Sequence, residues 1–366
     1  MKPKLRFKEF SDEYVLSDLG KYLIQYKKTT NSNNQYPVLT SSRSGIFFQE
    51  DYFNRQVASK DNTGYNIVPR NYFTYRHMSD DTIFSFNINT LCDYGIVSTL
   101  YPVFTTNTEM NSNYLKEYLN NSKRFSEYCL LQKQGGSRTY MYFDKLKKFV
   151  GCFPSIQEQT KVSNFLSLID KKIDLQSKKI EDLKLFKLSK YSSVFSKTNN
   201  KIKLSDICII EKGKQINSDL LIEKGNYYML NGGILPSGYL NEYNTNENTV
   251  TISEGGNSCG YVNFNKTKFW CGGHCYKIIS PSVNTSYLYH LLKYNEKIIM
   301  DLRVGSGLPN IQKKDLEALK LSIHKNDEQL KIGILFDTFD KKISLETDKL
   351  NKFKELKKAL MQVIFV

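Results

Sequence analysis

The feature of this sequence that most restricts its fold is an internal repeat at an offset of 170 residues. Glu158-Gln159 recurs as Glu328-Gln329, and Asp170-Lys171-Lys172-Ile173 recurs as Asp340-Lys341-Lys342-Ile343. Of the 39 positions from 158 to 196, 12 are identical to the position 170 residues later, without a gap. Because self-similarity at a fixed offset indicates a repeated structural unit, we expect the chain to build one architecture twice.

Each copy of the repeat predicts a long helix. Neither contains Pro after its start, and Pro154-Ser155 precede the first copy, where Pro is tolerated. Apolar residues at three- and four-residue steps form a seam that suits packing on another helix, and we favour antiparallel pairing of the two helices over packing of each on its neighbouring domain. The seam of the two helices includes Ile169, Ile173, Ile180, Phe339, Ile343, Leu350 and Phe353.

The segments outside the helices predict two further domains of mixed α/β character. β-formers and turn residues predict strands at 72–75, 83–86, 249–252 and 275–279, and helices at 114–119 and 287–292. A glycine loop lies near the end of each segment, at 135–137 and 305–307. The predicted division is therefore residues 1–153, a helix at 154–196, residues 197–323, and a helix at 324–366.

The charge of the chain favours a polyanionic partner. The net charge is +15 and the pI is about 9.2, and the segments 156–196 and 326–366 carry only +3 and +1 of it. A basic excess outside the helices favours nucleic acid, against the alternative of an ordinary soluble protein from a Lys- and Asn-rich proteome. The odd count of seven Cys predicts reduced thiols in a cytoplasm, and neither a membrane span nor a signal peptide is predicted.

With this organisation the chain resembles the specificity subunits of type I restriction-modification systems. The resemblance is carried by Leu5-Arg6-Phe7 with Phe10, by the glycine loops, by residues 154–159 with the helix that follows, and by the end of the chain at 360–366. The chain departs from the family at Tyr14, where Trp is frequent, and at Asn326-Asp327, which stand where the first copy has Pro.

The resemblance implies both a fold and a function. The fold is α+β, with two mixed α/β target-recognition domains separated by the family's two conserved helices, packed as an antiparallel coiled coil. Each domain reads one half of a bipartite site in double-stranded DNA, and the helices set the gap and dock two methyltransferase subunits. Those subunits bind S-adenosylmethionine and methylate adenine N6, and ATP-dependent translocase–nuclease restriction subunits are further partners. The chain itself is expected to be non-catalytic and to hold no cofactor.

The absence of common catalytic and metal-binding motifs supports the expectation that the chain is non-catalytic. The sequence has no Gly-x4-Gly-Lys-Ser/Thr loop, no Asn- or Asp-Pro-Pro-aromatic tetrapeptide and no His-Glu-x-x-His. Cys271, His274 and Cys275, with Cys259, offer zinc-ligand types, but adjacent His and Cys lack the paired spacing of structural zinc sites. A buried strand–turn–strand is the preferred interpretation, and no metal is predicted.

Basic and amide side chains outside the helices are the candidates for DNA contact, because Lys and Arg neutralise phosphates and Arg and Asn also read base edges. Arg138 and Arg303 rank first because they lie beside the glycine loops. A solvated surface charge is the alternative for each one. The full set is Lys27, Lys28, Arg43, Lys60, Arg70, Arg76, Arg138, Lys212, Lys214, Lys266, Lys268, Arg303 and Asn310.

Three other classes of protein compete with this interpretation. One is the specificity subunit of a type II-like methylase–nuclease system, which the sequence hardly separates from type I. Another is a coiled-coil scaffold with two protein-binding modules, and the third is an enzyme with its own active site. The sequence predicts neither the bases read nor the gap length, since both depend on side-chain placement and DNA shape.

Overall fold

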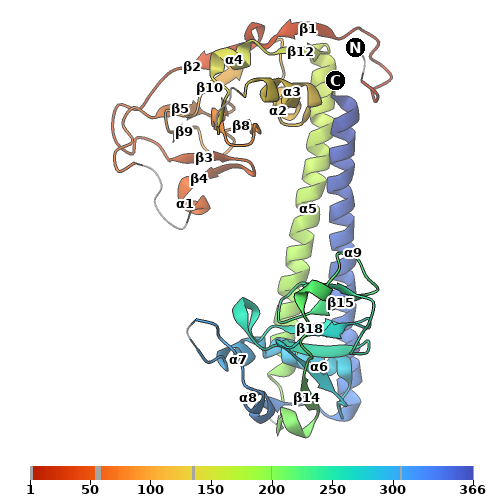
Figure 1. The fold of residues 1–366 in the computed structure, drawn as a ribbon. Coiled ribbons are helices and arrows are strands. Elements are labelled where there is room, and N and C mark those ends of the chain that lie inside the picture. The colour runs from red at the N-terminus through yellow and green to blue at the C-terminus, as the bar shows by residue number, and fades with distance from the viewer. Residues whose placement is uncertain (1–2, 54–58, 134–136, 199, 306, 366) are drawn as a thin grey trace. The chain divides into compact units, whose positions relative to one another are not determined.

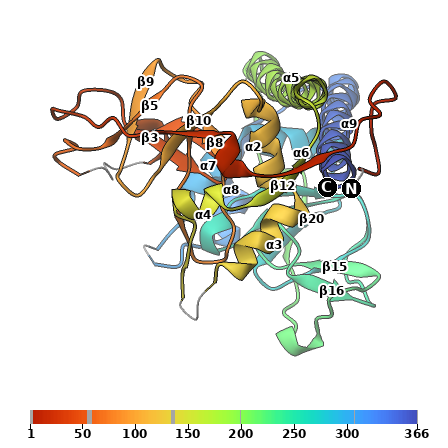
Figure 2. The ribbon, with the colours of Figure 1, turned by 90° about the horizontal axis from the view of Figure 1, so that it is seen from above.

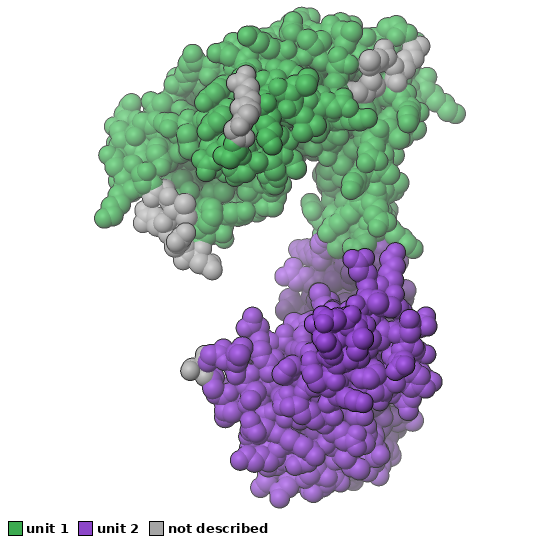
Figure 3. Space-filling model, viewed as in Figure 1, with its two compact units in different colours: residues 1–175, 350–366 green, residues 176–349 purple. Residues whose placement is uncertain are grey.

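A computed structural model describes residues 3–53, 59–133, 137–198, 200–305 and 307–365 of the chain (Figure 1). The chain divides into two compact units, unit 1 with residues 1–175 and 350–366, and unit 2 with residues 176–349 (Figure 3). Each unit joins one β-rich globular region to one half of each long helix. The boundary between the units therefore falls inside the helices, and the predicted four-part division stays a prediction.

The globular region of unit 1 is built from short antiparallel strand pairs around one four-stranded sheet, ordered β2-β10-β6-β8. The remaining pairs are β1-β12, β3-β4, β5-β9 and β7-β11. Its strands are β1 (Val15–Asp18), β2 (Leu23–Tyr26), β3 (Leu39–Ser42), β4 (Gly45–Phe48), β5 (Asn66–Pro69), β6 (Phe73–Thr74), β7 (Met78–Ser79), β8 (Asn87–Ile88), β9 (Tyr94–Val97), β10 (Val103–Thr106), β11 (Thr139–Tyr140) and β12 (Val150–Phe153). Its short helices are α1 (Gln49–Tyr52), α2 (Ser112–Asn121), α3 (Lys123–Leu131) and α4 (Phe143–Lys147), with a 3-10 turn at Leu19–Lys21.

The globular region of unit 2 also contains a four-stranded antiparallel sheet, ordered β14-β20-β17-β18. A three-stranded sheet, β16-β15-β19, and the pair β13-β21 complete it. Its strands are β13 (Lys201–Lys203), β14 (Ile209–Lys212), β15 (Tyr227–Leu230), β16 (Gly238–Leu240), β17 (Thr249–Ser253), β18 (Val262–Asn265), β19 (Trp270–Cys271), β20 (Cys275–Ile279) and β21 (Lys320–Ser322). Its short helices are α6 (Thr285–Tyr294), α7 (Glu296–Asp301) and α8 (Lys313–Ala318), with 3-10 turns at Leu204–Asp206, Ser218–Leu220 and Gly256–Ser258.

The two repeat copies form the long helices α5 (Ile156–Phe195) and α9 (Asn326–Ile364), which lie side by side in both views (Figures 1 and 2). In unit 1, Asp170 of α5 accepts hydrogen bonds of 2.7 and 2.8 Å from Lys357 of α9. In unit 2, Gln176 of α5 donates a hydrogen bond of 2.7 Å to a carboxylate oxygen of Glu346 of α9. Because higher numbers on α5 meet lower numbers on α9, the packing is antiparallel, and the predicted α+β class with two packed long helices is confirmed.

Each globular region joins the helices through the same junction, in which a buried Gln at the start of the long helix bonds a capping Asn. In unit 1, Gln159 accepts from the Asn111 backbone N–H at 2.9 Å and donates to the Pro154 carbonyl at 2.9 Å. In unit 2, Gln329 accepts from the Asn284 N–H at 3.3 Å and donates to the His324 carbonyl at 3.0 Å. The repeat detected in the helices therefore extends into the globular regions.

The same Asn residues begin the helix that follows each junction. The side chains of Asn111 and Asn284 accept from N–H groups of the first turns of α2 and α6, each at 3.0 Å, which satisfies a donor that a helix start leaves open. Each region then closes its chain ends with an antiparallel pair, β1-β12 or β13-β21, whose second strand leads into the long helix. These shared contacts give the two junctions the same local frame.

Each unit has its own hydrophobic core, and both cores include residues of both long helices. In unit 1, Leu166 of α5 and Phe365, the residue after α9, pack with Tyr114 and Tyr118 of α2. In unit 2, Phe195 of α5 and Phe336 of α9 pack with the buried face of α6. Burial of several large aromatic rings per unit stabilises the attachment of each region to the helices.

Three of the four predicted strands are confirmed at their centres, as β6, β17 and β20, and both predicted short helices are confirmed as parts of α2 and α6. The strand predicted at 83–86 is wrong. This segment has no ladder partner in the structure; Phe86 instead donates its N–H to the Asn120 side chain at 2.9 Å. A side chain there takes the place of a neighbouring strand.

Candidate nucleic-acid interface

In unit 1, two predicted arginines that are distant in sequence meet beside one pair of adjacent carboxylates. Arg43, in the turn between β3 and β4, lies 2.5 Å from Asp81, and Arg138 lies 3.1 Å from Asp80. The hydrogen bond from Arg43 lowers the pKa of Asp81 to about 2. Because these pairs are exposed, each contributes little to stability. Their main effect is to hold two guanidinium groups on one surface, where both can exchange a carboxylate for a phosphate.

A second candidate surface of unit 1 is an open pocket of about 530 Å³ beside the end of β2. Its lining combines the two predicted lysines of this segment with aromatic rings and amides: Tyr26, Lys27, Lys28, Thr29, Asn31, Gln35, Tyr36, Ile67 and Tyr94. Ammonium groups suit phosphates, whereas Asn and Gln are residue types that read adenine edges. Asn31 and Gln35 were missed by the sequence analysis, although amides next to a Lys pair are a usable signal.

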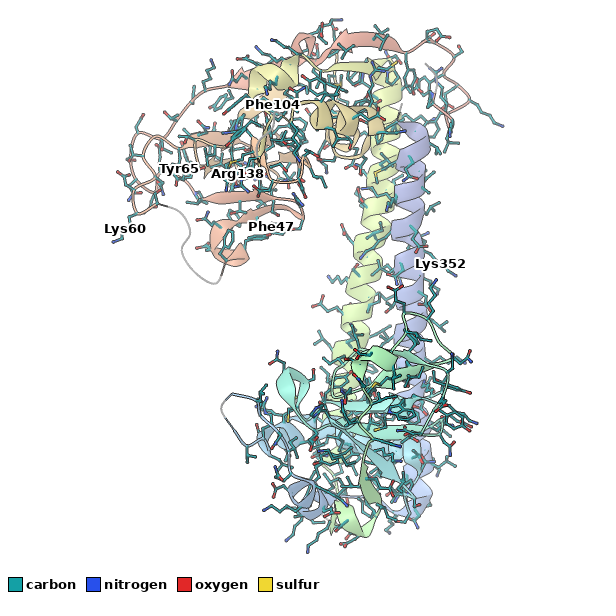
Figure 4. The ribbon with its side chains drawn as sticks, in the orientation of Figure 1. Phe47, Lys60, Tyr65, Phe104, Arg138 and Lys352 are labelled. Atoms are coloured by element: carbon teal, nitrogen blue, oxygen red, sulfur yellow. The ribbon has the colours of Figure 1, made fainter. Side chains whose placement is uncertain are left out.

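The other predicted residues of unit 1 are exposed but do not join one cluster. Arg70 pairs with Asp93 at 2.8 Å and donates 2.9 Å to the Thr90 carbonyl. Arg76 lies just before β7, and Lys60 lies in the loop before β5. Figure 4 shows Lys60 and Arg138 in separate parts of the unit. The glycine loop that ranked Arg138 first, at 135–136, lies outside the described residues.

In unit 2, several loops meet around the carboxylate of Glu254, whose side chain is only 12% exposed. Lys212, at the end of β14, lies 2.6 Å from this carboxylate, and His274 lies 3.7 Å from it. Tyr276 donates to it at 3.2 Å. Glu254 thereby holds the ammonium of Lys212, and the side chains of Lys212 and His274 are both exposed beside it. Neither Glu254 nor His274 was among the predicted residues.

The predicted residues Arg303 and Asn310 lie beside the same group of loops. Asn310 forms reciprocal backbone hydrogen bonds of 2.9 and 3.0 Å with Val304, and its neighbour Pro309 accepts from the Gly256 N–H at 3.1 Å. Gly305 has a φ of 97°, which favours glycine and lets the segment fold back on itself. Arg303 donates 2.6 Å to the Met300 carbonyl, so its guanidinium is turned towards the end of α7. Ser306 lies outside the described residues.

Lys214 adjoins an open pocket of about 600 Å³ that is rich in polar side chains. Its lining is Gln215, Ile216, Asn217, Ser218, Leu221, Met229, Asn231 and Ser237. Gln215 and Asn231 are residue types that read base edges, and both were missed. Lys266 and Lys268 lie apart, between β18 and β19, where Lys268 donates 3.1 Å to the Tyr243 hydroxyl, which raises the pKa of Lys268.

The seven predicted helix residues lie buried or half-buried. Phe339, for example, packs on Phe186 across the two helices with ring centroids 5.6 Å apart, and Phe353 lies under the Lys172 ammonium at 4.8 Å. The helices also expose apolar side chains, most of which lie outside the seam. These are Leu168, Leu175, Leu185, Phe186 and Leu188 on α5 and Leu330, Ile334, Leu335, Leu345 and Leu356 on α9. They were missed because a seam pattern marks the packed face, not the face left for a partner.

The structure locates the residues weighed for zinc. Cys259, Cys271 and Cys275 are buried, whereas His274 is exposed. Within the described ranges, no group of three or more His, Cys, Asp or Glu side chains is placed to hold a metal ion. Among the described helices, none is both long and apolar enough to cross a membrane.

Comparison with solved structures defines the class of fold. The chain is similar over its whole length to the S subunit of a type I restriction-modification system from Mycoplasma genitalium, with a TM-score of 0.64 and 18% identity, covering 100% of this chain and 99% of that one. It is also similar to a chain from a structural study of the complex assembly and conformational transition of the type I R-M system, with a TM-score of 0.59, 15% identity, and coverage of 96% and 97%. The fold is thus that of a specificity subunit.

Comparison of sequences finds similarity to a described domain family and to named relatives. Residues 196–355 match the family described as the type I restriction modification DNA specificity domain. A type I specificity subunit of Mycoplasma pneumoniae is 33% identical over 161 residues, which cover 43% of this chain and 42% of the relative. One of Mycoplasma genitalium is 31% identical over 138 residues, covering 37% and 36%. The chain is thus similar in sequence to type I specificity subunits, and the matched regions span less than half the length of these two relatives.

Proposed function

We propose that this chain is the DNA sequence-specificity subunit of a type I restriction-modification complex, in which each unit reads one half of a bipartite site. The observation that carries the proposal is the combination of one repeated junction with two different exposed surfaces. Unit 1 presents Arg43, Arg138 and the pocket beside Lys27, whereas unit 2 presents the loops around Lys212 and the pocket beside Gln215. A constant frame with differing polar surfaces suits two readers of unlike DNA sequences.

Reading would divide between phosphate contacts and base contacts. The exposed lysines and arginines neutralise phosphates and position each unit on the duplex. The amides of Asn31, Gln35, Gln215 and Asn231 are the residue types that pair with adenine edges, and Arg43 and Arg138 suit guanine. Substitution of a phosphate-contacting Lys would then weaken binding to every sequence, whereas substitution of a base-reading amide would relax one position of the site.

The helices would dock two methyltransferase subunits. Two exposed apolar positions recur at the offset of 170: Leu175 and Leu345 are 70% and 52% exposed, and Phe186 and Leu356 are 49% and 52% exposed. Paired apolar positions of this kind suit two copies of one partner bound in equivalent ways. In this proposal Leu175→Glu and Leu345→Glu each lose one methyltransferase subunit, and loss of both from either variant would contradict it.

We further propose that the helices set the length of the unread gap. At 1.5 Å per residue, a helix of 40 residues is about 60 Å long, which exceeds the 34–36 Å between half-sites one DNA turn apart. Insertion of two helical turns into both helices near Gln176 and Glu346 would change the gap and preserve both half-sites. A variant with altered half-sites and the old gap would contradict this role.

Catalysis would belong to the partners. The methyltransferase subunits would bind S-adenosylmethionine and methylate adenine N6, and restriction subunits that translocate and cleave DNA would complete the assembly in the cytoplasm. This chain supplies position and sequence choice to that reaction. Methylation by this chain alone, with S-adenosylmethionine supplied, would contradict the division of roles.

The experiment that tests the proposal is co-expression with the methyltransferase encoded nearby, followed by sequencing of methylated adenines in the host DNA. We expect a motif with two defined halves and a fixed gap, which disappears when this chain is deleted. Unchanged methylation after the deletion would instead favour a scaffold.

A further inference from the structure

Repeat-equivalent positions of the two junctions differ in what covers them. In unit 1, the segment 3–14 lies over the start of α5, where Arg6 donates two hydrogen bonds of 2.8 Å to the carboxylate of Glu158. Tyr14 donates to the same carboxylate at 3.0 Å, and Glu158 is only 1% exposed. A buried carboxylate needs such partners, because an unpaired one is strongly destabilising.

The next residues of this segment continue the contact along α5. Phe7 packs edge-on against Phe165 with ring centroids 5.8 Å apart. The Lys161 ammonium lies 5.0 Å from the Phe7 ring centroid and pairs with Glu9. The covering segment thus carries an Arg, an aromatic residue and an acid at positions 6, 7 and 9, matched by Glu158, by Phe165 and by Lys161.

In unit 2 the equivalent place is an open pocket of about 710 Å³ at the start of α9. Its described lining includes three residues that the offset of 170 relates to that contact: Glu328 to Glu158, Lys331 to Lys161, and Ile332 to Val162. The lining also contains Val194 and Ile323, which are half-buried. Leu335, equivalent to Phe165, is 41% exposed one turn further along the helix. Glu328 itself is exposed, and it accepts a 3.3 Å hydrogen bond from the Lys325 N–H.

We infer that this pocket of unit 2 is a docking site for an extended segment of the methyltransferase subunit that carries an Arg followed by an aromatic residue, with an acid two positions later. The Arg pairs with Glu328, the aromatic ring covers Leu335 and Ile332, and the acid pairs with Lys331. This inference rests on the proposed function, because that function supplies the partner. It goes further by naming the chemistry of the segment and its place.

A second copy of this chain is a poorer occupant than a separate partner. To bind there, segment 3–14 of the second copy would have to leave its own α5. This would break the Arg6–Glu158 ion pair, leave the Glu158 carboxylate without Arg6, and lose the Phe7–Phe165 contact. An intramolecular contact of the same chemistry is favoured by effective concentration over an intermolecular one. The pocket also has Lys197 and Lys325 in its lining, so the match to the segment rests on the repeat-equivalent Glu328, Lys331 and Ile332, which suit a segment of similar chemistry from another chain.

The test uses the full chain and, as probe, a fluorescent synthetic peptide with the sequence of residues 3–13. We expect saturable binding in fluorescence anisotropy, weakened at least tenfold by Glu328→Arg. A peptide with Arg6→Glu should bind the Glu328→Arg chain at least as well as the original pair, because the charges are exchanged. Glu355→Arg, an equal change at another exposed position of α9, serves as the control and should leave binding unchanged. No binding, or binding that Glu328→Arg leaves unaffected, would overturn the site.

The same probe identifies the occupant. The complex purified with the methyltransferase should bind the peptide at least tenfold more weakly than the chain alone, and Glu328→Arg should reduce retention of the methyltransferase without altering the methylated motif. Peptide binding to the complex equal to that of the free chain would overturn the methyltransferase as occupant. Failure of the proposed function is a separate result, since it would appear as a motif that does not depend on this chain.

Discussion

Near each junction, α5 and α9 are joined by an equivalent Lys–Asp ion pair, and the two units differ in the side chain beside this pair. In unit 1, Lys357 of α9 contacts Asp170 of α5 and lies 3.4 Å from Glu117 of α2. In unit 2, Lys187 of α5 contacts Asp340 of α9, and the neighbouring group is His290 of α6, which is fully buried. Lys187 and Asp340 stand at the offset of 170 from Lys357 and Asp170. The repeat has therefore preserved the pair and exchanged the third group.

The exchanged group changes how each junction balances charge. In unit 1 the Lys357 ammonium faces two carboxylates, and one of them, Glu117, also lies 3.2 Å from the Lys116 ammonium. In unit 2 the imidazole lies 2.7 Å from the Tyr191 hydroxyl and 3.1 Å from Asp337. Burial, with a contribution from Lys187, lowers the pKa of His290 to about 4. Unit 2 is thus built around a neutral His, and the comparison predicts that the two junctions respond differently to substitution and to acid.

The largest expected difference follows from removal of the shared lysine. Lys357→Met leaves Asp170 without its ammonium and removes one of the two ammonium groups beside the buried Glu117, which keeps Lys116 at 3.2 Å. The change should destabilise unit 1 by about 3 kcal/mol, the lower end of the cost of breaking a buried ion pair. Lys187→Met leaves one partly exposed carboxylate and relieves the repulsion on His290, so its cost in unit 2 should be smaller. Hydrogen exchange of α2 and α6 amides measures each unit separately. Equal losses would show that the third group has no influence.

Acid should affect unit 2 through His290. Because the pKa of the folded state lies below the ordinary value of 6.5, stability is fully present above pH 6.5 and is lost as the pH falls towards about 4. A shift of this size corresponds to about 3 kcal/mol. Protection of α6 amides, measured from pH 7 to pH 4.5, should fall in the wild type, and His290→Gln should flatten this dependence. A dependence that survives the substitution would assign it to another group.

A smaller and equal effect is expected at the glutamines that the junctions share. Gln159→Leu and Gln329→Leu each leave a backbone N–H without its acceptor and should cost about 1–3 kcal/mol in their own unit. Exchange at the first turns of α2 and α6 reports the loss. Costs that differ by more than about 1 kcal/mol would contradict an equivalent role of the two junctions.

The smallest effect on stability is expected at Glu328 of unit 2, which is exposed whereas its equivalent in unit 1, Glu158, is buried. Glu328→Gln should change the stability of the isolated chain by less than about 0.5 kcal/mol, because Glu328 is exposed. Glu158→Gln removes the buried partner of Arg6 and should be clearly destabilising in thermal unfolding. A large effect of Glu328→Gln would mean that this carboxylate already has a structural partner within the chain.

The sequence predicted those parts of the fold that depend on local pattern. The repeated Glu-Gln and Asp-Lys-Lys-Ile runs located both long helices, and the apolar period identified their packed seam. The sequence did not predict that Gln159 and Gln329 bond Asn111 and Asn284, because these contacts join positions that are 45 or more residues apart. It likewise had no signal for His290, since a lone His on a helix does not reveal its buried neighbours.

The candidate interface was less predictable than the fold. Their charge made Lys212 and Arg43 candidates for DNA contact. The carboxylates near these candidates and near Arg138, which are Glu254, Asp80 and Asp81, lie on other loops, so only the fold shows that they are neighbours. The predicted residues are basic apart from one Asn, and they do not include the amides that line both pockets. Residue type alone cannot separate a solvated charge from a reading group, because position on the assembled surface decides the role.

The most direct test of the account is the methylated motif of cells that carry a reading-surface variant in one unit only. Arg43→Ala with Arg138→Ala in unit 1, and Lys212→Ala with Gln215→Ala in unit 2, should each relax or abolish recognition of one half-site and leave the other half and the gap unchanged. The affected halves should be different for the two variants. Variants that alter both halves together, or that leave the motif intact while the complex still methylates DNA, would contradict two separate readers on one repeated frame.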